Sequence, residues 1–157
     1  MKKCILWVFA LFAFSFTQAQ EQGNIRFQIG GDYKLSIQDF GAHVGVEYFF
    51  ADRFSLAPSF TFWFPPVGRS SNLNMDLRYY LTEGSSQLYV LGGYGNYWIN
   101  TQPGMVGETV TRPGGNFGLG AYLRVADSWG INTEFKVQSQ NTRQPVLRIG
   151  LVFVLGD

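Results

Sequence analysis

The sequence predicts an all-β chain that forms an eight-stranded antiparallel up-and-down transmembrane β-barrel. Three observations predict this fold. Apolar and polar residues alternate with a period of two from residue 24 onward, which is the pattern of β-strands. Charged residues make up only 15% of the 157 residues, while aromatic residues make up 17%. Bulky side chains gather on the apolar face of the alternating segments, and glycines gather on the polar face.

The N-terminal residues precede the alternating pattern and predict export. Lys2 and Lys3 form a short positive region, an unbroken apolar run covers residues 4–16, and Thr17 and Ala19 place small residues at −3 and −1 of a cut after Ala19. This is the layout of a secretory signal peptide, and the run is shorter than the about 20 residues of a transmembrane helix. We therefore expect a signal peptide at 1–19 and a barrel domain at 20–157; the alternative is an uncleaved N-terminal anchor.

The first four strands have readable faces. Residues 24–37 alternate Ile, Phe, Tyr and Leu with Asn, Arg, Gln, Asp and Lys. Residues 40–50 alternate Phe, Val and Tyr with glycine, histidine and glutamate, and residues 53–64 alternate Phe and Leu with Ser and Thr. Residues 72–81 set Leu, Met and Tyr against Asn, Asp and Arg. Each segment is long enough to cross a membrane as a strand of about 9–11 residues.

The last four strands follow the same rule with one exception. Residues 87–99 are apolar on both parities, so their faces stay unassigned. Residues 116–125 alternate Phe and Leu with glycine, residues 129–138 alternate Trp, Ile and Phe with Asn, Glu and Lys, and residues 146–155 alternate Leu, Ile and Phe with Val, Arg and Gly. No amphipathic helical pattern competes with these strands.

The links between the strands alternate in length. Short links follow the second, fourth and sixth strands, at 51–52, 83–86 and 126–128. Longer or more variable links follow the other strands, at 38–39, 65–70, 100–112 and 139–144. Successive strands joined in this way form an antiparallel meander, with the short links at one end.

Side-chain size predicts which face points inward. An eight-stranded barrel has an interior just wide enough to be filled by side chains. The polar face carries the small residues and the apolar face carries most of the phenylalanines, which would overfill a closed barrel. A lipocalin-like barrel or a sandwich would turn the apolar face inward, whereas a membrane barrel turns it toward lipid. We favour the membrane barrel, in which a closed sheet pairs every backbone group.

These features resemble the small outer-membrane β-barrels, including the OmpA- and OmpX-like barrels and Bacteroidota members. The resemblance rests on the eight strands, the turns at 50–53 and 125–128, and the segment 89–95 (Tyr-Val-Leu-Gly-Gly-Tyr-Gly). It implies a cell outer-membrane location, periplasmic termini and tight turns, longer loops outside, and recognition of the last strand by the barrel assembly machinery. Such barrels often end on an aromatic residue, whereas here Phe153 is the nearest aromatic to the C-terminus.

The inward face is the candidate functional site. Its charged residues and its histidine are Arg26, Asp32, Lys34, His43, Glu47, Arg53, Asp76, Arg78, Arg124, Glu134, Lys136 and Arg148. Seven are basic and four are acidic, so we expect a polar plug of paired charges with a basic excess, because unpaired buried charge is costly. The alternative is a porin-like narrow channel. His43 points inward with no nucleophile beside it in the sequence, so we expect no enzymatic activity.

Two further features concern the ends of the barrel. Aromatic residues near both strand ends predict interfacial girdles, and these are Tyr48, Phe50, Phe54, Trp63, Phe64, Tyr97, Trp98 and Trp129. The loop at 100–112 is the longest, and binding often resides on loops held by a rigid scaffold. We therefore expect this loop to offer a surface for an extracellular partner.

The composition limits the other partners. Twelve Lys and Arg against eleven Asp and Glu leave a formal charge of +1, which argues against nucleic-acid binding. A single cysteine and a single histidine argue against a metal site, and no motif calls for a cofactor. We expect a monomer in outer-membrane lipid with a structural or surface-interaction role. The alternatives are a narrow channel for ions or very small solutes and a soluble lipocalin-like binder.

Overall fold

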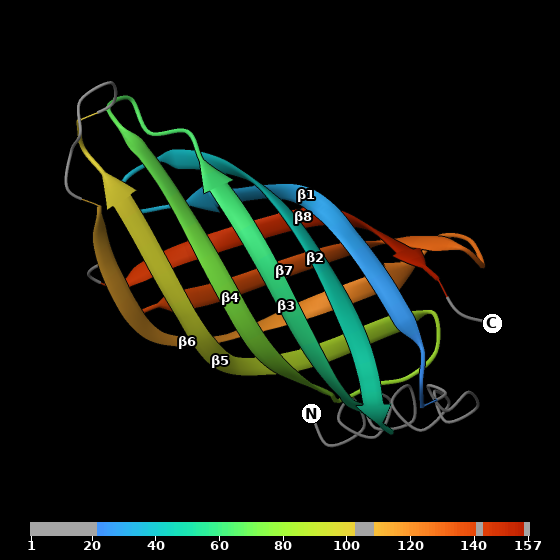
Figure 1. The fold of residues 1–157 in the computed structure, drawn as a ribbon. Coiled ribbons are helices and arrows are strands. Elements are labelled where there is room, and N and C mark those ends of the chain that lie inside the picture. The colour runs from blue at the N-terminus through green and yellow to red at the C-terminus, as the bar shows by residue number, and fades with distance from the viewer. Residues whose placement is uncertain (1–21, 103–108, 141–142, 156–157) are drawn as a thin grey trace, which may run out of the picture.

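The computed structural model describes residues 22–102, 109–140 and 143–155, and within them the chain is a closed antiparallel β-barrel (Figure 1). The eight strands are β1 (Ile25–Lys34), β2 (Asp39–Ala51), β3 (Phe54–Trp63), β4 (Arg69–Tyr80), β5 (Ser86–Asn100), β6 (Val110–Arg124), β7 (Trp129–Gln138) and β8 (Gln144–Val154). Each strand pairs with the next, and β1 pairs with β8 to close the barrel. The predicted fold class is confirmed. No helix in the described part of the chain is long and apolar enough to cross a membrane.

The barrel has two distinct ends, which we call the terminal end and the loop end. The terminal end holds the start of β1, the end of β8 and the links at 52–53, 81–85 and 125–128. The loop end holds the links at 35–38, 64–68, 101–109 and 139–143. The predicted short links therefore lie at one end, as expected. The predicted signal peptide lies outside the described residues, as does the middle of the predicted loop at 100–112.

Three strand boundaries differ by three or more residues from the sequence-based expectation. β1 ends at Lys34 because Lys34 pairs with Asp39, and the chain turns within 35–38 through Gln38 at a positive φ of 57°. β4 begins at Arg69 and β6 begins at Val110, both earlier than predicted. Pairing with β5 extends both β4 and β6, because β5 continues to Asn100 and supplies partners for their first residues. Alternation within a single strand carries no information about how far its partner extends.

The inward and outward faces match the predicted assignment. Large apolar side chains point outward on every strand, including Phe117 at 73% exposed and Ile29 at 47%. The inward face is closely packed, and glycines there lie against large neighbours. Tyr89 packs over Gly120 on β6, and Trp63 packs over Gly41 on β2, so that a Cβ at either glycine would clash with the ring. The predicted reason for the glycines, a crowded interior, is confirmed.

The structure also settles the faces of β5, which the sequence left unassigned. Gln87, Tyr89, Leu91 and Tyr97 are buried inside the barrel, while Leu88 and other residues of the opposite parity face outward. Both parities read as apolar because tyrosines, glycines and a leucine take most inward positions of β5, which carries no charged residue.

Candidate functional site

The barrel interior is the candidate functional site. Ten of the twelve predicted residues are buried inside it. These are Arg26, Asp32, Lys34, His43, Glu47, Asp76, Arg78, Glu134, Lys136 and Arg148. They form a charged middle and one aromatic-lined cation toward each end.

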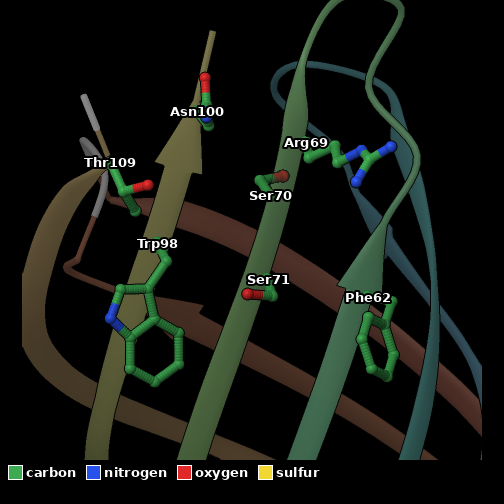
Figure 2. A pocket seen from close by; sticks show the side chains of 7 residues that line it. All are labelled: Phe62, Arg69, Ser70, Ser71, Trp98, Asn100 and Thr109. Atoms are coloured by element: carbon green, nitrogen blue, oxygen red, sulfur yellow. The ribbon is translucent and has the colours of Figure 1, made fainter. Parts of the chain in front are cut away.

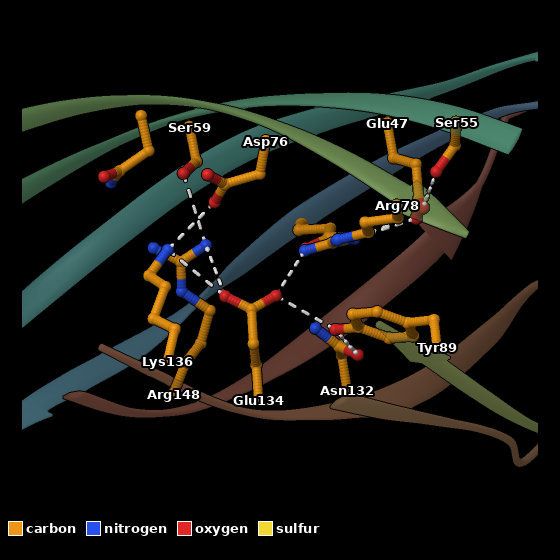
Figure 3. A network of polar contacts seen from close by, with 12 residues as sticks. Glu47, Ser55, Ser59, Asp76, Arg78, Tyr89, Asn132, Glu134, Lys136 and Arg148 are labelled. Carbon is orange, nitrogen blue, oxygen red and sulfur yellow. Dashed lines mark hydrogen bonds and ion pairs between the residues drawn. The ribbon is translucent and has the colours of Figure 1, made fainter. Parts of the chain in front are cut away.

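Glu134 on β7 is the centre of the charged middle (Figure 3). Its carboxylate lies 2.7 Å from Arg78 Nη2, 3.2 Å from Lys136 Nζ and 3.8 Å from Arg148 Nη1. Tyr89 donates a hydrogen bond to the same carboxylate at 3.0 Å. Three cations therefore surround one carboxylate, and four strands are joined through it.

Each of these three cations also has a second carboxylate. Arg78 Nη1 lies 3.1 Å from Glu47, and Lys136 Nζ lies 3.1 Å from Asp76. Arg148 donates two hydrogen bonds to Asp32, at 2.7 and 2.8 Å. Because each cation lies between two carboxylates, the cost of removing its charge from water is offset by its partners.

His43 lies at the edge of this network. Its Nδ1 is 3.0 Å from Asp32 Oδ1, and its ring packs against Gly30 and Gly150. Thr61 Oγ1 donates to Asp32 at 2.8 Å, and none of the hydrogen bonds of the described residues joins a hydroxyl to His43. The histidine is therefore held by a carboxylate inside a packed interior, without the hydroxyl–imidazole contact of nucleophilic catalysis.

Arg26 occupies the interior toward the terminal end. Its Cζ lies 4.6 Å from the ring centroid of Phe49 and 4.3 Å from that of Tyr122. Its Nη2 donates to Gln87 Oε1 at 3.0 Å. The rings surround the guanidinium and provide cation–π stabilisation where the described residues place no carboxylate within ion-pair distance of it.

Lys34 occupies the interior toward the loop end. Its Nζ lies 4.0 Å from the ring of Trp63 and 4.2 Å from the ring of Tyr97. Both rings are buried, at 4% and 3% exposed, and pack with Val146. The prediction that Trp63 and Tyr97 belong to an outward interfacial girdle is therefore wrong. Their parity places them inside, where both rings lie against the ammonium group of Lys34.

The other predicted interfacial aromatics face outward. Tyr48, Phe50 and Phe54 lie toward the terminal end and are 46%, 42% and 38% exposed. Phe64 lies at the loop end and is 62% exposed. Trp98 and Trp129 are partly buried at outward positions near opposite ends.

Two predicted interior cations lie at the rim instead. Arg53 is in the link before β3, with its side chain 37% exposed, and its Nε donates to Glu83 at 2.6 Å. That hydrogen bond raises the pKa of Arg53. Arg124, the last residue of β6, is half-buried at the same end. Arg53 lies in a link outside the strand pairing, whereas Arg124 keeps the inward parity of Tyr122 but ends β6, so the rim leaves it only half-buried.

The predicted basic excess is also wrong. Asp39, which the sequence placed in a link, is buried at the start of β2 opposite Lys34. Among the described residues the buried charges are then five basic and five acidic, with His43 in addition. The acidic members are Asp32, Asp39, Glu47, Asp76 and Glu134. Formal charge is balanced inside the barrel.

Sequence reasoning missed an amide cluster in the loop half of the interior. Asn116 donates to Asn74 at 2.9 Å and to Asp76 at 2.7 Å, and Gln138 donates to Asn74 at 2.9 Å. Gln140 donates to Asn116 at 2.6 Å. The alternating pattern already placed Asn74, Asn116 and Gln138 on the inward face. Gln140 follows the end of β7, so the pattern gave no direction for its side chain.

Hydrogen bonds and ion pairs fill the middle of the interior, and Arg26 and Lys34 lie against aromatic rings toward its two ends. No group of three or more metal-ligating residues of the kind that holds an ion occurs within the described ranges. The interior groups are held by one another, which makes them suited to stabilising the closed wall.

Comparison with known proteins finds a similar fold but no similar sequence. The sequence matches no protein family model and no curated protein. The N-terminal β-barrel domain of Pseudomonas aeruginosa OprF matches with a TM-score of 0.70 and 18% identity, over 88% of this chain and 100% of that domain. The fold is that of the small outer-membrane β-barrels.

Two further solved structures share it. Ail, the attachment invasion locus protein of Yersinia pestis, in complex with the heparin analogue sucrose octasulfate, has a TM-score of 0.63 and 15% identity, over 86% of this chain and 100% of that chain. A de novo designed transmembrane β-barrel has a TM-score of 0.60 and 13% identity, over 88% of this chain and 100% of the design. Identities this low establish the architecture alone.

Proposed function

We propose that this chain is an integral outer-membrane β-barrel protein with a structural or surface-interaction role and no catalysis. The observation that carries the proposal is the outward face. Large apolar side chains cover it on all eight strands, from Ile25 on β1 to Phe153 on β8. Such a wall would be a contiguous apolar patch far beyond what soluble monomers expose, whereas it matches the lipid-facing band of a membrane barrel.

The same observation disfavours a soluble lipocalin-like binder. A ligand-binding barrel of that kind turns its apolar face toward the lumen. Here the lumen holds the charged and amide side chains. Phe49 is buried inside, whereas many other phenylalanines of the described residues are exposed on the outer face. The direction of the aromatic residues supports the membrane barrel.

The filled interior favours a plugged barrel over a channel. Charged side chains in the middle are paired across the lumen, and aromatic rings close around Arg26 and Lys34 toward the two ends. Stable conductance would require this network to open. The narrow channel for ions or very small solutes is the alternative that a conductance measurement decides.

The remaining parts of the proposal extend the resemblance. We propose export through a cleaved signal peptide at 1–19, an OmpA- or OmpX-like barrel of the Bacteroidota type, and insertion as a monomer by the barrel assembly machinery, with Phe153 as the aromatic signal. The tight links would face the periplasm. The loop at 100–112 would face outward and present a surface to an extracellular partner.

The test is the behaviour of the chain in lipid. We expect the purified chain to insert into phospholipid vesicles and to migrate differently on gels before and after boiling, as a folded barrel does. A chain that stays soluble and monomeric without detergent would contradict the membrane proposal. In planar bilayers we expect no stable conductance, and steps that persist after insertion would replace the plug by the channel.

A further inference from the structure

A hollow near the loop end lies on the outer side of the barrel wall, and its lining also includes Ser70, which is buried at an inward position (Figure 2). It has a volume of about 430 Å³ and lies over β3, β4 and β5. Ser71 is paired with Phe62 on one side and Trp98 on the other. The small serine between two large rings leaves the depression, and toward the middle of the barrel the Trp98 ring stacks on Phe60, with ring centroids 6.3 Å apart.

The rim of the hollow nearest the loop end is polar and positively charged. Arg69, Asn100 and Thr109 line it, and Arg69 is directly paired with Asn100. By strand alternation, Arg69 is the one charged residue at an outward-facing position among the described strand residues; Arg112, paired with Tyr97, lies on the inward side. Arg69 is exposed, and no carboxylate in the described part of the chain forms an ion pair with it.

This arrangement is amphipathic along the barrel axis. Aromatic rings and Leu73 lie on the side toward the middle of the barrel, and Arg69 with its partner Asn100 lies at the end of the strand pair nearest the loops. An arginine at this level suits a phosphate, which it binds through paired N–H donors. Aromatic side chains at the same level suit the boundary between acyl chains and head groups.

We propose that the hollow binds a membrane lipid with an anionic phosphate head group. Arg69 pairs with the phosphate, Asn100 and Thr109 donate hydrogen bonds to the head group, and an acyl chain lies across Ser71 between Phe62 and Trp98. The inference rests on the proposed membrane location. Charge complementarity selects an anionic lipid, and the aromatic walls select a lipid over free phosphate.

The test uses quenching of Trp98 fluorescence by brominated lipids. The mature chain carrying Trp129→Phe is inserted into phosphatidylcholine vesicles containing either brominated phosphatidylglycerol or brominated phosphatidylcholine at the same mole fraction. Trp63 is buried inside the barrel and therefore shielded. We expect about fivefold enrichment of phosphatidylglycerol over phosphatidylcholine at Trp98, the effect of one arginine near an anionic lipid.

Two variants separate charge from shape. Arg69→Gln is expected to abolish the enrichment, and Ser71→Leu is expected to abolish it by filling the hollow while keeping the charge. Arg143→Gln is the matched control, because Arg143 is an exposed arginine in a different link of the loop end; it should keep the enrichment. Equal loss in Arg143→Gln would mean general surface charge and would overturn the site.

Three further results are decisive. No quenching by either brominated lipid would mean that the chain does not insert, which overturns the membrane proposal and this inference together. Equal quenching by both lipids in an inserted, heat-modifiable barrel overturns the lipid site alone. Displacement of the enriched lipid by inorganic phosphate would show a free-phosphate site and overturn the lipid assignment.

Discussion

The inner and outer faces of this one sheet come from the same alternation of side chains but meet opposite packing requirements. The inner face must fill a narrow lumen with charges that neutralise one another, and it does so with ion pairs around Glu134 and glycines beneath the large rings. The outer face has no volume limit and carries bulky apolar residues such as Phe117. The effect of a substitution therefore depends on the face that carries it, since the same chemical change has opposite consequences for stability inside and outside the barrel.

The largest expected effect is at the centre of the inner face. Glu134→Gln removes the carboxylate that three cations share, and loss of a buried ion-pair partner costs about 3–5 kcal/mol. We expect the free energy of unfolding from lipid vesicles, measured by denaturant titration, to fall by this amount. The charge-balanced double variant Glu134→Gln/Lys136→Met should recover part of the loss. A double variant no more stable than Glu134→Gln would contradict the shared-charge account.

The next effect is at the centre of the outer face. Val44 faces outward between Ile29 and Phe60, and an arginine there should cost about 2–4 kcal/mol if lipid surrounds it. The same titration in vesicles measures this cost. Val67→Arg is the matched control, because Val67 lies in the link at 64–68 and is 71% exposed; it should change stability little. Equal effects at the two positions would argue that lipid does not contact Val44.

A smaller loss of stability is expected when a glycine of the inner face is replaced, and a glycine of the outer face provides the comparison. A Cβ at Gly120 would clash with the Tyr89 ring, whereas a Cβ at Gly92 on the outer face meets nothing within 4 Å. Gly120→Ala should therefore destabilise the barrel by about 1–3 kcal/mol through overpacking. Gly92→Ala should be neutral or slightly stabilising. Thermal loss of the fast-migrating folded form on gels reports both, and a reversed order would contradict the crowded interior.

The smallest effect is at the terminal rim. The ion pair between Arg53 and Glu83 is solvent-accessible, and exposed pairs contribute little to stability. Arg53→Gln should leave the unfolding midpoint unchanged at both low and high salt. A loss as large as that of Glu134→Gln would show that the charged network extends to the rim.

Much of the architecture was predictable because it depends on local alternation. The number of strands, their order and the direction of most side chains follow from a period of two, and the size difference between the faces predicts which one points inward. Predictions failed where alternation ends. Arg53 and Arg124 lie at a turn and a strand end, and Asp39 begins a strand earlier than the pattern showed.

Local alternation and side-chain size were enough to predict a closed β-barrel with bulky apolar residues on one face and glycine and charge on the other. Which residues pair across the lumen depends on the folded barrel. Ion pairs such as Arg148 with Asp32 join residues more than a hundred positions apart, and their pairing depends on strand register and barrel closure. For the same reason, the charge balance of the interior and the closure of Trp63 and Tyr97 around Lys34 became visible only in the folded barrel.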